Sequence, residues 1–98
     1  MSDKPQKDEE IFWTAVEDII ALANERAEQE GLGVVNGALQ QAAAHFNAFY
    51  LAVSSESRED LIEDKDQVIQ DFCASYKRTL ATSLEDYIEN YDAQIKSD

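Results

Sequence analysis

Residues Gly31 to Ser55 contain no Lys, Arg, Asp or Glu, although 30% of the chain is charged. Every formal charge lies outside this run of 25 residues: nine acids and three bases precede it, and twelve acids and five bases follow it. A helix without charges between two highly charged helices is expected to be enclosed by them, or by another subunit. The pattern therefore indicates how the chain is organised and assigns no activity.

The composition favours one small helical domain. A chain of 98 residues forms a single domain with a thin core. The hydrophobic content of 44% supports a globular core rather than a wholly disordered chain. Three Gly and one Pro provide few turns, which favours long helices over many short strands.

The acidic balance limits the classes of partner. A net charge of −13 disfavours binding to nucleic acid or to anionic membranes, so any electrostatic partner should be basic. The first ten residues have no apolar signal-peptide core, and we expect cytoplasmic residence. The charge-free run is too polar for a membrane span, because it contains Asn36, Gln40, Gln41, His45 and Asn47.

The N-terminal part of the chain is predicted to be a short tail followed by a helix. Residues 1–7 are polar, contain Pro5 and have no periodicity, which is typical of a disordered tail. The helix is predicted from Asp8 to Glu30, since acidic residues follow Asp8 and Gly31 follows the last turn. Its apolar face consists of Phe12, Val16, Ile19, Ile20, Ala23 and Ala27, with Trp13 at the edge.

A second helix is predicted from Val34 to Ser54, and its two faces differ. The larger face is apolar and consists of Val35, Leu39, Ala42, Phe46, Phe49, Tyr50 and Val53. The opposite face carries small and uncharged polar side chains, where a solvated helix usually carries Glu and Lys. Small side chains allow a second helix to approach closely, so we predict a self-association interface on this face. Its residues are Gly37, Gln41, Ala44, Ala48, Leu51 and Ala52.

A third helix follows a polar break after Ser54. Ser57 and Asp60 form a capping pattern at its start, with Asp in place of the usual Glu or Gln. One apolar stripe then stays in phase through Ile62, Ile69, Phe72, Cys73, Tyr76, Leu80, Leu84, Tyr87 and Tyr91. Because neither Gly nor Pro occurs after Ser54, one continuous helix is the simplest interpretation.

Two alternatives for the third helix remain open. One is a break near Asp64, and the other is a break near Thr82 followed by a short fourth helix. In either case we predict an all-α fold, a three-helix bundle over residues 8–93 with the charge-free helix at its centre. Residues 94–98 are expected to fray.

Chemical motifs are absent or incomplete. The single His (His45) and single Cys (Cys73) cannot form the ligand sets of zinc or di-iron sites. A calcium-loop pattern that begins at residues 64–66 is broken, because Val68 and Ile69 occupy the next ligand position and the Gly position. We expect a structural role for His45 and a core position for Cys73. The sequence therefore predicts no catalytic, cofactor-binding or metal-binding residues.

Several aromatic and Asn positions resemble a family of short proteobacterial proteins of unknown function. The resemblance covers roughly Ile11 to Ile88. It is carried by Phe12-Trp13, Leu22-Ala23-Asn24-Glu25, Ala43-Ala44-x-Phe46-Asn47-Ala48-Phe49, Phe72-x-x-x-Tyr76-x-x-x-Leu80 and Leu84-x-x-Tyr87. It implies a small bacterial all-helical domain and brings no activity, cofactor or site residue.

Three functional hypotheses follow from the sequence. We favour a non-enzymatic protein-interaction or structural module that forms homo-oligomers. An acidic regulator or nucleic-acid mimic that binds a basic protein is the alternative, because the net charge is −13. The third hypothesis is an enzyme or small-ligand binder with an apolar pocket under Trp13 or among the tyrosines, although no nucleophile–base pair supports it.

Overall fold

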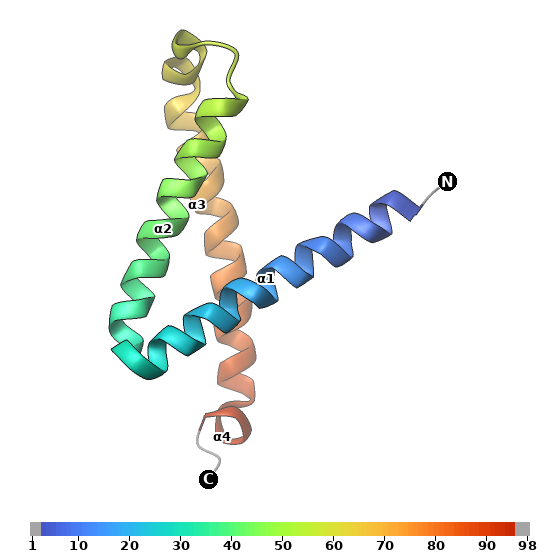
Figure 1. The fold of residues 1–98 in the computed structure, drawn as a ribbon, viewed down its shortest axis with the longest axis vertical. Helices are drawn as coiled ribbons and strands as arrows, with labels where there is room; N and C mark the ends of the chain where they lie inside the picture. The colour runs from blue at the N-terminus through green and yellow to red at the C-terminus, as the bar shows by residue number, and fades with distance from the viewer. Residues whose placement is uncertain (1–2, 96–98) are drawn as a thin grey trace. The chain divides into compact units, whose positions relative to one another are not determined.

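The computed structural model describes the backbone of residues 3–95 and the side chains of residues 7–95. Four helices follow one another along the chain: α1 (Asp3–Glu30), α2 (Leu32–Ser54), α3 (Arg58–Glu89) and α4 (Tyr91–Gln94) (Figure 1). No strand occurs within residues 3–95. The predicted all-α fold is therefore confirmed.

The chain divides into two compact units at the boundary between Tyr50 and Leu51, near the end of α2. The first unit holds α1 and most of α2, and the second holds the last turn of α2 together with α3 and α4. Each unit contains one of the two joints that interrupt the long helices.

One glycine joins α1 to α2 in the first unit. Gly31 has a φ of 100°, which side-chain-bearing residues rarely adopt. Its N–H donates to the carbonyl oxygen of Ala27 at 2.9 Å, and its own carbonyl accepts from the N–H of Val35 at 3.3 Å. Gly31 therefore ends one helix and starts the next, as its place after the predicted first helix indicated.

The second joint, Ser55 to Ser57, ends α2 and caps α3. The hydroxyl of Ser55 donates to the carbonyl oxygen of Leu51 at 3.1 Å. Ser57 has an extended backbone, and its hydroxyl oxygen accepts from the N–H of Asp60 at 3.1 Å. The predicted cap is confirmed, and Glu59 and Asp60 add negative charge to the first turn, where the helix dipole favours it.

Helix α3 runs without interruption past both Asp64 and Thr82, so the continuous-helix interpretation is confirmed. It ends at Glu89 and is capped by Asn90, whose side-chain amide donates to the carbonyl oxygen of Asp86 at 3.0 Å. The short helix α4 follows directly. A short fourth helix is thus present, but it begins at Tyr91 rather than after Thr82.

The ends of the helical region differ from the predicted bounds. Helix α1 begins at Asp3 rather than Asp8, so the predicted tail of residues 1–7 is helical from Asp3 onward, and residues 1–2 lie outside the described residues. Gln94, where fraying was expected, is the last residue of α4, and residues 96–98 lie outside the described residues.

Side-chain burial is low throughout residues 7–95, where no side chain is buried. In the first unit, several half-buried side chains belong to the predicted apolar faces: Val16, Ala23, Ala27 and Val35. In the second unit, Leu61 and Val68 are half-buried on α3, although the predicted stripe did not include them. The three long helices are confirmed, whereas their packing as a bundle stays a prediction.

Candidate functional site on the charge-free helix

The charge-free run folds almost entirely into α2. Ala, Leu and Gln make up much of this helix, and all three have good helix propensity. Its first turn contains no acidic side chain and its last turn contains no basic one, so no charged group compensates the helix dipole at either end. The stability of α2 therefore depends on its backbone hydrogen bonds and on the packing of its faces.

All six predicted interface residues lie on one side of α2. At 100° per residue they fall within an arc of about 100°. Leu51 is half-buried, and the other five are exposed. A Cβ placed on Gly37 would meet no atom within 4 Å, so the helix backbone is open to a neighbour there. Small side chains along a helix face reduce the distance at which a second helix can pack.

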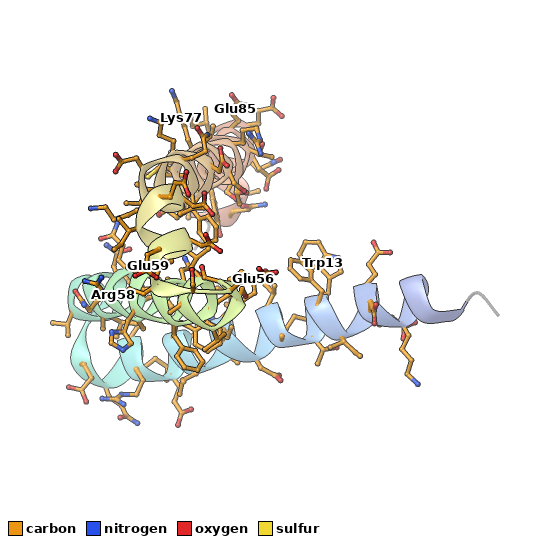
Figure 2. All side chains as sticks on the ribbon, turned by 90° about the horizontal axis from the view of Figure 1, so that it is seen from above. Trp13, Glu56, Arg58, Glu59, Lys77 and Glu85 are labelled. Atoms are coloured by element: carbon orange, nitrogen blue, oxygen red, sulfur yellow. The ribbon has the colours of Figure 1, made fainter. Side chains whose placement is uncertain are left out.

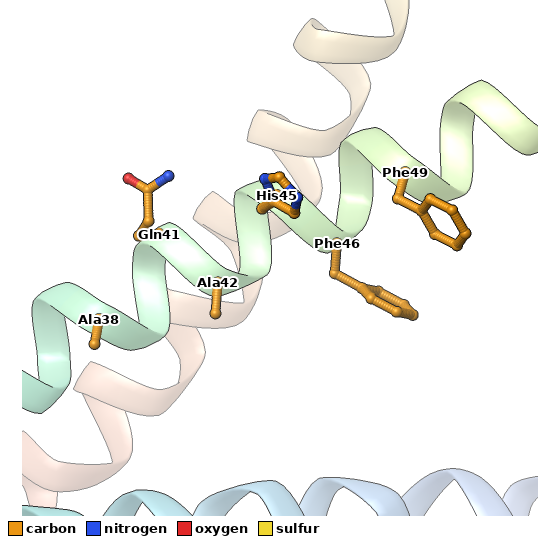
Figure 3. A pocket seen from close by; sticks show the side chains of 6 residues that line it. All are labelled: Ala38, Gln41, Ala42, His45, Phe46 and Phe49. Carbon is orange, nitrogen blue, oxygen red and sulfur yellow. The ribbon is translucent and has the colours of Figure 1, made fainter.

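A shallow groove lies along the flank of α2, between its small face and its large apolar face (Figure 3). The rings of Phe46 and Phe49 form one end, with centroids 6.2 Å apart and planes tilted by 46°. Both rings are more than half exposed, at 68% and 58%. The full lining consists of Ala38, Gln41, Ala42, His45, Phe46 and Phe49. Gln41 therefore borders both this groove and the predicted interface.

A second groove lies between α1 and α2 within the first unit. Ile19 and Ala23 of the predicted α1 face line it opposite Val35 of α2. Leu22, Arg26 and Glu30 also line it, and none of the three was among the residues predicted for that face. Only the turn at Gly31 brings these residues together. The side chains of Arg26 and Glu30 are 3.5 Å apart at its polar edge.

The surroundings of Trp13 are acidic rather than apolar. Trp13 packs edge-on against Phe12, with ring centroids 5.0 Å apart, and is 54% exposed on α1 (Figure 2). The groove beside it is lined by Glu9, Glu10, Trp13, Thr14 and Glu17, all on the same helix. An apolar pocket under Trp13 was one basis of the small-ligand hypothesis, and this groove does not supply it.

The remaining chemically reactive side chains are dispersed. Cys73 is exposed on α3, whereas its place in the apolar stripe predicted a core position. Tyr76, Tyr87 and Tyr91 are about half exposed along the same helix and α4. Within residues 3–95, no group of three or more His, Cys, Asp or Glu side chains could hold a metal ion. The exposed faces of the helices, and above all those of α2, are therefore the candidate sites.

Comparison with known proteins identifies the family. The family described as "Protein of unknown function (DUF3144)" matches residues 12–88. The chain belongs to this family. A search of curated proteins and a search of solved structures returned no match.

The DUF3144 match covers α1 from Phe12, all of α2, and α3 up to Ile88. It coincides closely with the span from Ile11 to Ile88 predicted from the aromatic and Asn positions. The family description carries no activity, so the DUF3144 family confirms the resemblance without assigning chemistry. None of the helices within residues 3–95 combines the length and hydrophobicity that a membrane crossing requires.

Proposed function

We propose that this protein is a non-enzymatic protein-interaction or structural module that self-associates through the small face of α2. The observation that carries the proposal is the absence of charge from residues 31–55 in a chain of net charge −13. Five of the six residues of this face are exposed, and Gly37 leaves the backbone open. The partner is a second copy of this chain.

Electrostatics favours this face over the others for contact between two copies. Two chains of charge −13 repel each other, so a stable contact must keep their carboxylates apart. Exposed charges are largely screened beyond about 10 Å at 0.1 M ionic strength. The charge-free helix places uncharged side chains at the contact and leaves the acidic residues of α1 and α3 outside it.

We also propose that the apolar stripes of the three long helices pack together as a three-helix bundle with α2 at the centre. The stripe spacing supports this proposal. Intervals of four, three, four, four and three residues separate Val35, Leu39, Ala42, Phe46, Tyr50 and Val53 on α2. The same intervals separate Ile69, Cys73, Tyr76, Leu80, Leu84 and Tyr87 on α3.

Equal spacing has a geometric consequence. The five intervals sum to 18 residues over five turns, which is 3.6 residues per turn, the period of an undistorted helix. Stripes of this period run nearly straight along their helices, so long helices can remain in contact without left-handed supercoiling. In such a bundle the large apolar face of α2 is covered by the same chain, and its small face remains available for the second copy.

Sedimentation equilibrium on the wild type and on Ala48→Glu tests the proposed self-association. The substitution puts a carboxylate at the middle of the small face, and we expect the complex to dissociate to the 11.0 kDa monomer. Ala74→Glu is the matched control, because Ala74 is exposed on α3 outside its apolar stripe. This variant should retain the wild-type mass. A wild type that is monomeric at high concentration would contradict self-association. An Ala48→Glu variant that still associates would show that the contact does not involve the small face of α2.

An acidic regulator or nucleic-acid mimic that binds a basic protein is the second proposal. The exposed carboxylates on α3 favour it, because several lie on the side opposite the apolar stripe: Asp60, Asp64, Asp71, Glu85 and Glu89. A complex held by these groups weakens steeply with salt. Affinity capture at low and at molar salt is the test: loss of a basic partner at high salt supports the proposal, and a partner that resists molar salt contradicts it.

A small-ligand binder is the weakest of the three proposals, since the groove beside Trp13 is acidic and open. A thermal-shift screen with metabolites tests it, and a ligand that raises the melting temperature would support it. Cytoplasmic residence and the lack of catalysis stay predictions.

A further inference from the structure

We draw no further inference here: the strongest candidate, the groove between α1 and α2 in the first unit that is lined by Ile19, Leu22, Ala23, Val35, Ala38 and Leu39, is an unpartnered apolar surface, and nothing in the structure shows what covers it.

Discussion

Helices α2 and α3 each contain six apolar positions with the same spacing, but they differ in charge and in how they begin. Helix α2 has no charged side chain, whereas α3 combines ten carboxylates and bases in its first 21 residues alone, from Arg58 to Arg78. Helix α2 begins after a glycine with positive φ, whereas α3 begins with a serine cap and two acidic residues in its first turn. The apolar stripe alone therefore does not explain why α2 has no charged side chain.

The difference between the two helices indicates how many of their faces need a partner. The side of α3 opposite its stripe is rich in carboxylates, which water solvates well, so this helix needs cover on one side. Apart from Leu51, the corresponding side of α2 offers water small side chains and amides, among them Gly37, Ala44 and Ala48. Helix α2 is the one expected to have neighbours on both sides.

The largest expected effect concerns the large apolar face of α2. Given the proposed bundle, Phe46→Glu should lower the free energy of unfolding by about 3–5 kcal/mol, because it replaces an aromatic side chain of the packed face with a charge. Thermal unfolding followed by circular dichroism measures the loss, with Phe46→Leu as an apolar control that should stay within about 1.5 kcal/mol of the wild type. Wild-type stability in Phe46→Glu would refute the bundle, since this face would then need no cover.

The glycine joint before α2 should give the next largest effect. Gly31→Ala forces a side chain into a positive-φ conformation and should destabilise the protein by about 1–2 kcal/mol in urea unfolding. Gly33→Ala is the matched control, because a Cβ at either glycine would meet no atom within 4 Å. The control lies inside α2 and should be stabilising by up to about 1 kcal/mol. Equal effects of the two substitutions would show that the backbone at Gly31 is not constrained.

The serine cap of α3 should contribute somewhat less. Ser57→Ala removes the acceptor for the Asp60 N–H and should cost about 1 kcal/mol. Ser83→Ala is the comparison, since Ser83 has the same capping pattern in the sequence but lies inside the unbroken α3. It should be neutral or slightly stabilising, because Ala is the better helix former. A larger loss at Ser83 than at Ser57 in urea unfolding would favour a break at Thr82.

The smallest effect concerns salt. Raising the NaCl concentration should increase the melting temperature slightly and tighten self-association, because it screens repulsion between acidic surfaces while leaving the uncharged face of α2 unaffected. The triple variant Asp60→Asn, Asp64→Asn, Asp71→Asn should respond less to salt, since it removes carboxylates from the back of α3. Association that weakens as salt increases would instead indicate that charged groups hold the copies together.

Both joints could be predicted from the sequence because each depends on local chemistry. Gly31 follows a complete amphipathic pattern, and Ser57 has an acidic residue three positions later. Ser83 shows the same signal, yet α3 continues through it. A cap contributes only about 1 kcal/mol, whereas ending a helix leaves up to four backbone groups without intrahelical partners. With Leu80, Leu84 and Tyr87 continuing the stripe, continuation is favoured.

The candidate site was predictable only in part. The six residues of the small face follow from helical periodicity, and all six lie on α2. Of the groove residues that were not predicted, Glu30 follows Phe12 by 18 residues, or five turns, and so shares its angle on α1, whereas Leu22 lies outside the predicted face. The path of the chain at Gly31 decides which side chains of α1 turn toward α2. By contrast, the acidic surroundings of Trp13 follow from the helix itself, since Glu9, Glu10 and Glu17 lie three or four residues from it.

The sequence by itself determined three long helices, the two joints and the phase of each apolar stripe, because caps, helix propensity and periodicity depend on the order of residues within one helix. The structure decided between a continuous α3 and its two broken alternatives, and it brought residues from α1 and α2 together in one groove. These features depend on competition between local signals and on the direction of the chain at one residue, and no periodic pattern encodes that direction.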